Sequence, residues 1–125
     1  YQFLGVSDKL GSNRNVFGDA VVSVLGEMSD AERIEKVIFI DSDLEGSCGF
    51  KKIHDAYPDV FIPSGIMERG NLSAAAGFGM AEAKQGVFAT FSAFLEMCTS
   101  PMQVSTIWQI IPVTSGLTIC LPTMD

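Results

Sequence analysis

Basic residues are scarce in this sequence. Of its 125 residues, 8 are Lys or Arg and 15 are Asp or Glu, which gives a formal net charge of −7 at neutral pH. Proteins that track nucleic-acid phosphates or adhere to anionic membranes do so with clustered Lys and Arg. The charge balance therefore argues against a nucleic-acid partner and against binding to a membrane surface.

Long apolar runs are also missing. No segment approaches the roughly 20 apolar residues that a helix needs to cross a bilayer. The first residues, Tyr1 to Gly5, lack the basic and apolar regions of a signal peptide, although the chain begins without Met. We therefore expect a cytoplasmic protein that has no contact with a membrane.

Histidine and cysteine are too few and too scattered for the common catalytic and metal sites that use them. His54 is the only histidine, which disfavours His-dependent triads and multi-histidine zinc sites. Cys48, Cys98 and Cys120 are odd in number and far apart, which favours free thiols over a disulfide framework.

An acidic segment, residues 41–47, is the remaining candidate for a metal site. Asp41, Asp43 and Glu45 could hold a hard cation, but no acid follows Gly46 at the distance that an EF-hand requires. Solvated loop acids are the favoured interpretation, and polar contact with a cofactor is the second. We predict no metal site in this chain.

Apolar residues make up 47% of the chain, enough for the core of one domain. Short runs rich in β-branched and aromatic residues alternate with segments of helical periodicity, and the charged segment 29–35 is expected to be solvated. This alternation predicts an α/β fold of three layers, with a mostly parallel sheet flanked by helices. Strands are predicted at residues 36–41, 60–62 and 86–91, and helices at 13–28, capped by Asn13, at 49–57, at 66–83 and from Ser92.

The sequence changes character near its end. Residues 104–122 carry no charge and are rich in Ile, Val, Thr and Leu. Such a segment forms either one or two further strands or an apolar tail that tends to self-associate. We therefore divide the chain into a domain at residues 1–103 and a tail at residues 104–125.

Three segments, in their order along the chain, resemble the pyrimidine-binding domain of transketolase-like thiamine diphosphate enzymes. They are an acidic post-strand loop, a Gly-Ile-x-Glu segment and a Thr-Phe-x-x-Phe run, at residues 41–47, 65–71 and 90–94. The resemblance extends over about residues 13–100. It implies part of a thiamine diphosphate-binding fold, from an enzyme family that transfers two-carbon ketol units.

The resemblance implies a catalytic role for Glu68. The matching glutamate of the family shares a proton with N1′ of the aminopyrimidine ring and so activates the cofactor. Position alone gives a plainer interpretation, because an acid in the first turn of a helix is stabilised there by the free backbone N–H groups.

The same resemblance assigns five further residues. Asp43, Phe91 and Phe94 match residues that contact the cofactor, and Ser47 and Arg14 match residues that hold a sugar phosphate substrate. Without the resemblance, Phe91 and Phe94 would be assigned to the core. Many relatives carry a further aromatic residue where this chain has Met97, a change that loosens the pocket wall.

The family binds magnesium and the diphosphate in a separate domain, through a Gly-Asp-Gly…Asn segment that this sequence does not contain. The later histidine loop of the family is also absent from it. We therefore expect thiamine diphosphate binding and turnover only with a diphosphate-binding partner chain or in a homodimer. The alternatives are a self-associating, non-catalytic interaction protein and a small-molecule binder that uses residues 41–47.

Overall fold

The structure, a computed structural model, describes residues 11–110 and 117–120, with side chains through residue 104. No helix in these ranges is long and apolar enough to span a membrane. The elements are α1 (Asn13–Gly26), α2 (Asp30–Lys36), β1 (Val37–Asp41), α3 (Glu45–Cys48), α4 (Lys51–Ala56), the 3₁₀ turn η1 (Pro58–Val60), β2 (Phe61–Pro63), α5 (Glu68–Gly79), β3 (Gln85–Ala89), the 3₁₀ helix η2 (Ser92–Cys98), α6 (Thr99–Ile110) and β4 (Leu117–Cys120).

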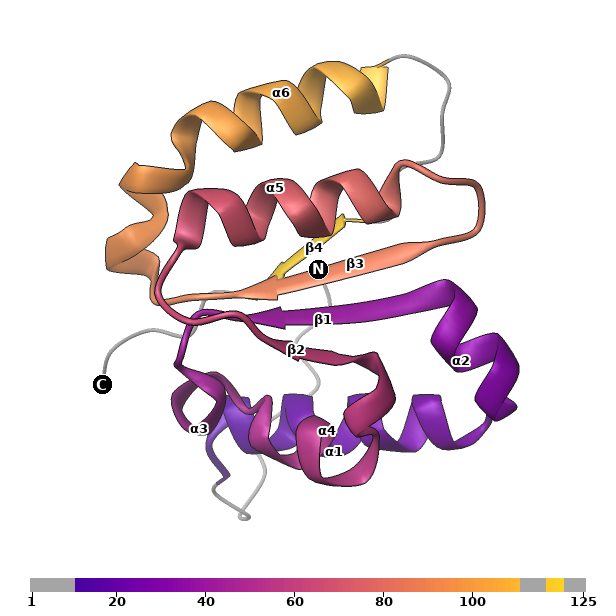
Figure 1. The fold of residues 1–125 in the computed structure, drawn as a ribbon. Helices are drawn as coiled ribbons and strands as arrows, with labels where there is room; N and C mark the ends of the chain where they lie inside the picture. Colours follow the sequence, from indigo (N-terminus) through magenta and orange to yellow (C-terminus); the bar gives the residue numbers. More distant parts are fainter. Residues whose placement is uncertain (1–10, 111–116, 121–125) are drawn as a thin grey trace, which may run out of the picture.

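The four described strands form one parallel sheet in the order β2-β1-β3-β4. Helices α5 and α6 lie on one side of the sheet, and α1 and α4 lie on the other (Figure 1). This confirms the predicted α/β fold with helices on both faces of a parallel sheet. Because all strands run the same way, their carboxyl ends share one edge, with Asp41 beside both Pro63 and Ala89.

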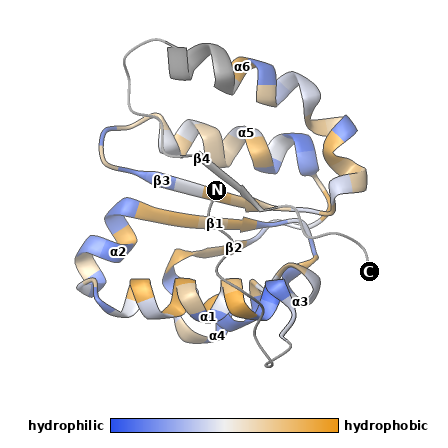
Figure 2. Ribbon diagram, turned by 180° about the vertical axis from the view of Figure 1, so that it is seen from behind, coloured by the Kyte–Doolittle hydropathy of each residue, from blue (hydrophilic) through white to orange (hydrophobic). Residues whose placement is uncertain are grey.

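The side chains of successive residues of β1 pack into two different hydrophobic cores, one on each face of the sheet. Phe39 packs toward α1 and α4, and Ile40 packs toward α5. Strands covered on both faces are expected to be almost continuously apolar, as β1 is in Figure 2. The sheet is therefore fixed from both sides, and its carboxyl edge is a rigid support for the loops that follow the strands.

Helix boundaries differ from the prediction at several places, and the helix predicted over 66–83 is the shorter α5. Ser12, and not Asn13, caps α1, because its side chain accepts the backbone N–H of Asn15 at 3.4 Å. The helix predicted over 49–57 is α4, and a short helix that was not predicted, α3, precedes it and ends at Gly49, whose φ is +80°. A left-handed residue cannot continue a right-handed helix, and glycine adopts that conformation at little cost.

Residues beyond 104 contain a strand, as one of the two interpretations predicted. β4 pairs in parallel with β3, with Val87 opposite Thr118. The first part of this segment is helical, however, because α6 continues to Ile110. A short apolar run fits a helix and a strand equally well, and here α6 lies along α5 (Figure 1). Residues 121–125 lie outside the described residues.

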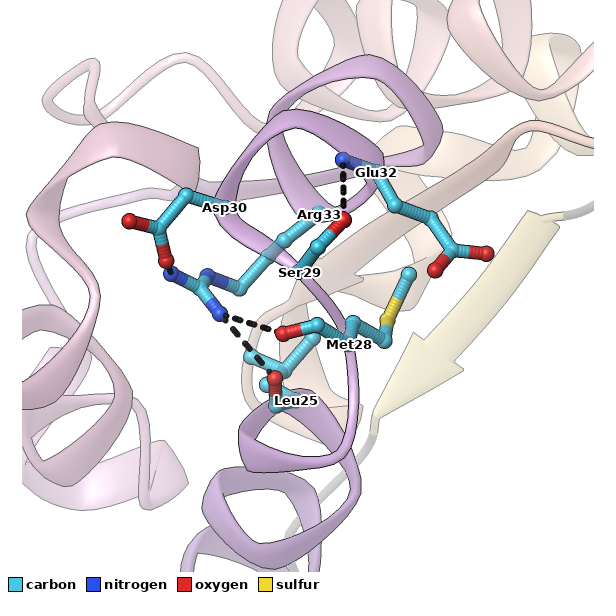
Figure 3. A network of polar contacts seen from close by, with 6 residues as sticks. All are labelled: Leu25, Met28, Ser29, Asp30, Glu32 and Arg33. Atoms are coloured by element: carbon cyan, nitrogen blue, oxygen red, sulfur yellow. Dashed lines mark hydrogen bonds and ion pairs between the residues drawn. The ribbon is translucent and has the colours of Figure 1, made fainter.

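The charged segment 29–35 is not uniformly solvated, because Arg33 is buried. Its Nη1 donates to the carbonyl oxygens of Leu25 at 3.1 Å and Met28 at 3.2 Å, and its Nη2 pairs with Asp30 at 2.5 Å (Figure 3). The guanidinium also lies 4.2 Å from the centroid of the Tyr57 ring. Arg33 thus ties the end of α1 to α2 and to the residue that precedes η1.

Replacing Arg33 with Lys should lower the free energy of unfolding by about 1–2 kcal/mol, since an ammonium cannot reach both carbonyls and stack on Tyr57. Urea unfolding of the two proteins measures the difference. The exposed Arg69 is the matched control, and Arg69→Lys should leave stability unchanged. Equal midpoints for Arg33→Lys and the unchanged protein would show that the network adds nothing to stability.

Candidate functional site

Three loops meet at the carboxyl edge of the sheet. They follow β1, β2 and β3 at residues 42–44, 64–67 and 90–91. Ligands of open parallel sheets bind at this edge, because the loops there can vary while the strands hold them in place. All of the sequence-predicted site residues except Arg14 lie in these loops or in the helices that directly follow them.

Asn71 joins two of the loops, although sequence reasoning gave it no role. Its side chain is buried, and its amide donates to Ser42 Oγ at 2.8 Å and to the Gly65 carbonyl oxygen at 3.0 Å. The backbone N–H of Ser64 also donates to the carbonyl oxygen of Asp41 at 3.2 Å. The only signal in the sequence was that Asn71 is a polar residue on the side of a predicted helix that faces the sheet. These bonds place the start of α5 against the end of β1.

Asp41 ends β1 with a buried carboxyl group. Its Oδ2 accepts the backbone N–H of Leu44 at 3.0 Å, and its Oδ1 is buried without a partner among the described residues. Burial raises the pKa of this carboxyl above its ordinary value, although the bond from Leu44 acts in the opposite direction. The next acid, Asp43, is exposed and has a φ of +64°.

Asp41→Asn should change how stability depends on pH. The folded chain holds the Asp41 proton more tightly than the unfolded chain, so the unchanged protein loses stability as pH rises from the ordinary to the raised pKa. The Asn variant lacks this loss. Its free energy of unfolding should therefore improve relative to the unchanged protein as the pH rises above 3.8, the ordinary pKa of an aspartate. Parallel pH profiles in urea unfolding would contradict the prediction.

Arg14 reaches the same edge through a close contact between backbones. An added Cβ on Gly49 would lie 2.1 Å from the carbonyl oxygen of Arg14, and one on Gly18 would lie 2.5 Å from the Gly49 oxygen. Helix α1 therefore approaches the end of α3 at a distance that only glycines permit. The contact brings the first turn of α1, which carries the exposed Arg14, beside the helix that carries Ser47.

Glu68 is the first residue of α5, and only 7% of its surface is exposed. It lines a hollow of about 260 Å³ together with Met67, Arg69, Gly70 and Met97. The pKa of the Cys98 thiol is raised by burial and, to a smaller extent, by the charge of Glu68. The start of α5 and the end of η2 therefore line one open hollow, in which Glu68 is the acidic residue and Met67 and Met97 are the apolar ones.

Phe91 and Phe94 lie together just after β3. Their ring centroids are 6.0 Å apart at an interplanar angle of 42°, and both residues are half-buried. They are not core residues, the plainer interpretation of the sequence. Neither residue lines the hollow at Glu68, where Met97 of the same η2 helix is found instead. Thr90, which precedes them, is buried, and its hydroxyl has no partner among the described residues.

The predicted residues thus fall into two groups at one edge. The first group lies in or next to α1 and α3 and consists of Arg14, Asp43 and Ser47. The second group consists of Glu68, which shares a hollow with Met97 of η2, and of Phe91 and Phe94 at the start of η2. Asn71, Ser42 and the Asp41 carbonyl form the polar link between the ends of β1 and α5. Within residues 11–110 and 117–120, no three His, Cys, Asp or Glu side chains cluster closely enough to hold a metal ion.

Comparisons with known proteins agree with this architecture. The protein family described as "Transketolase, pyrimidine binding domain" matches residues 13–120, and so extends beyond residue 103, where the sequence analysis ended the domain. The 1-deoxy-D-xylulose-5-phosphate synthase of Oleidesulfovibrio alaskensis is 32% identical over 108 residues, which are 86% of this chain and 16% of the relative. The enzyme of the same name from Clostridium perfringens is 29% identical over 112 residues, which are 88% of this chain and 17% of the relative. The chain spans about one sixth of the length of these relatives.

Proposed function

This chain belongs to the transketolase pyrimidine-binding domain family, and on that premise we propose that it binds the aminopyrimidine ring of thiamine diphosphate in an enzyme that transfers two-carbon ketol units. The observation that carries the proposal is the position of Glu68. A glutamate whose surface is 93% buried, at the start of a helix and beside a hollow, matches the requirement for a residue that exchanges a proton with a ring nitrogen.

The residues around Glu68 fit a flat, mostly apolar ring with one polar edge. Met67 and Met97 line the hollow, and Phe91 and Phe94 offer aromatic faces at the same edge of the sheet. When bound, thiamine diphosphate supplies the carbanion chemistry of ketol transfer. Glu68 holds or releases a proton at the ring nitrogen, and the methionine side chains exclude water from that bond.

Glu68 is held in place by its own helix. The backbone N–H of Asn71 donates to the Met67 carbonyl oxygen at 2.8 Å, closing the first turn of α5. The side-chain amide of Asn71 donates hydrogen bonds that fix this turn to Ser42 and Gly65. The proton-exchanging carboxylate is therefore mounted on a helix that is anchored to the sheet, and not on a free loop.

The second group of residues suits a phosphate-bearing substrate. The names of the two relatives specify a sugar phosphate, 1-deoxy-D-xylulose 5-phosphate, as the product that those enzymes make. We assign Arg14 and Ser47 to the phosphate of the substrate and Asp43 to the cofactor. The guanidinium of the exposed Arg14 supplies the cation, and the Ser47 hydroxyl supplies a hydrogen bond at the neighbouring helix.

The hollow at Glu68 has an apolar rim that favours a partner. Ile66 is 73% exposed, Met67 57% and Met97 48%. Apolar side chains gathered around a polar group are typical of interfaces. We propose that a diphosphate-binding partner, in a separate chain or in a homodimer of the complete enzyme, closes the hollow and holds the magnesium ion.

A thermal-shift titration tests the proposal. The chain, combined with a diphosphate-binding partner chain, is titrated with thiamine diphosphate and magnesium. We expect saturable stabilisation, which Glu68→Ala weakens and the exposed Glu82→Ala leaves intact. A complete assembly that shows no stabilisation, or the same stabilisation in both variants, would refute the role of Glu68.

A further inference from the structure

His54 lies outside the hollow and outside the residues assigned above. Its Nδ1 is 2.7 Å from Glu45 Oε2, and both side chains are about two-thirds buried, with exposed fractions of 34% and 32%. A carboxylate can only accept, so Nδ1 donates this hydrogen bond. The bond joins α4 to the first residue of α3, nine positions earlier in the chain.

The ring of His54 is itself fixed by the core. It stacks on Phe61 at a centroid distance of 4.3 Å and an interplanar angle of 9°. Phe61 in turn meets the buried Phe50 edge-on. A ring held in this way has little rotational freedom left, so the position of its Nδ1 is set by β2 and by the core beneath α4.

Glu45 belongs to the loop and helix that carry two of the assigned ligand residues. Asp43 lies two residues before it and Ser47 two residues after it. Asp41 holds the inner end of this segment, because its carboxylate accepts the N–H of Leu44. The bond between His54 and Glu45 holds the outer side, so the segment is tied at two points with the exposed Asp43 between them.

We infer that His54 is a positioning residue, which through Glu45 fixes the segment that presents Asp43 and Ser47 to the ligand. The ligand role of this segment rests on the proposed function. The mechanical role of His54 does not, because it follows from the contacts among α3, α4 and β2 alone. Lys51, on the same helix, is paired with Asp55 and is not the residue that anchors Glu45 through a hydrogen bond.

Two substitutions separate the hydrogen bond from the ring. His54→Phe keeps an aromatic ring for Phe61 and removes the donor, whereas His54→Asn places an amide N–H near the position of Nδ1 and removes most of the ring. Asp55→Asn is the control, since it breaks only the exposed pair with Lys51. Amide hydrogen exchange of the chain without ligand reports on the backbone N–H groups of Leu44, Ser47 and Cys48, all bonded within the segment.

We expect His54→Phe to speed the exchange of these three amides about fivefold, while the Tyr57 amide at the end of α4 changes little. In His54→Asn the same three amides should exchange nearly as slowly as in the unchanged protein. Faster exchange in His54→Asn than in His54→Phe would overturn the inference, because it would mean that stacking and not the bond holds the segment. Exchange rates that are unchanged in both variants would also overturn the inference.

A second measurement keeps the failure of the inference distinct from that of the proposed function. The assembled enzyme is titrated with thiamine diphosphate and with inorganic phosphate, and His54→Phe should weaken binding of at least one of them about threefold or more. Faster exchange without any loss of binding would uphold the positioning role and remove Asp43 and Ser47 from the ligand site.

Discussion

Gly49→Ala should destabilise the chain by about 3 kcal/mol or more. The φ of +80° costs an L-residue about 1–2 kcal/mol. The new methyl group would also lie 2.1 Å from the Arg14 carbonyl oxygen, so α1 has to move away from α3. The neighbour is backbone and not the end of a flexible side chain, and no local rotation can relieve the overlap. Urea or thermal unfolding measures the loss.

Gly46→Ala is the matched control, three residues earlier in the same segment. An added Cβ there meets nothing within 4 Å, and the residue lies inside α3. Alanine favours a helix over glycine by about 0.5–1 kcal/mol, so this variant should be as stable as the unchanged protein or slightly more stable. Equal losses in the two variants would mean that the approach of α1 to Gly49 is not as close as the structure shows.

Glu68→Gln should lower the rate of two-carbon transfer in the complete enzyme at least about 100-fold. Glutamine fills the same space and can form a hydrogen bond, but it cannot exchange a proton with the ring nitrogen at neutral pH. The loss should appear in kcat with a smaller change in KM, because the substrate contacts assigned to Arg14 and Ser47 are intact. Steady-state kinetics of the assembled enzyme measures both constants.

Glu82→Gln provides the control for charge. Glu82 is exposed in the turn after α5, so the variant removes the same charge beyond the opposite end of that helix. Its rate should stay within about twofold of the unchanged enzyme. A Glu68→Gln variant that retains full activity would show that the hollow at the start of α5 is not the place where the proton is exchanged.

The layers of the fold could be predicted because each of the first three strands is a short apolar run that is recognisable in the sequence. The run at 37–41 is apolar and β-branched up to an acid, as expected for a strand that is buried on both faces and ends at the carboxyl edge. The helix in residues 104–110 was not predictable in this way, because its apolar residues suit either period and tertiary packing decides between them.

The position of Glu68 could be predicted from the sequence, whereas the contacts of three other polar residues could not. A Gly-Ile-x-Glu segment after a strand predicts that Glu68 lies at the start of a helix, and in the structure Glu68 is the first residue of α5. The roles of Arg33, Asn71 and His54 could not be predicted, because each depends on partners from other elements. The partners of Asn71 and Arg33 include backbone carbonyls, which leave no mark in the sequence.

The most direct test of the central claim is a binding cycle between Glu68 and the ring nitrogen. Dissociation constants are measured for thiamine diphosphate and for an analogue in which carbon replaces N1′, with the assembled protein carrying either Glu68 or Glu68→Gln. If Glu68 bonds to that nitrogen, the analogue should cost the unchanged protein about tenfold or more in affinity and the variant far less. Equal losses in the two proteins would contradict the assignment of Glu68 as the residue that exchanges a proton with the cofactor.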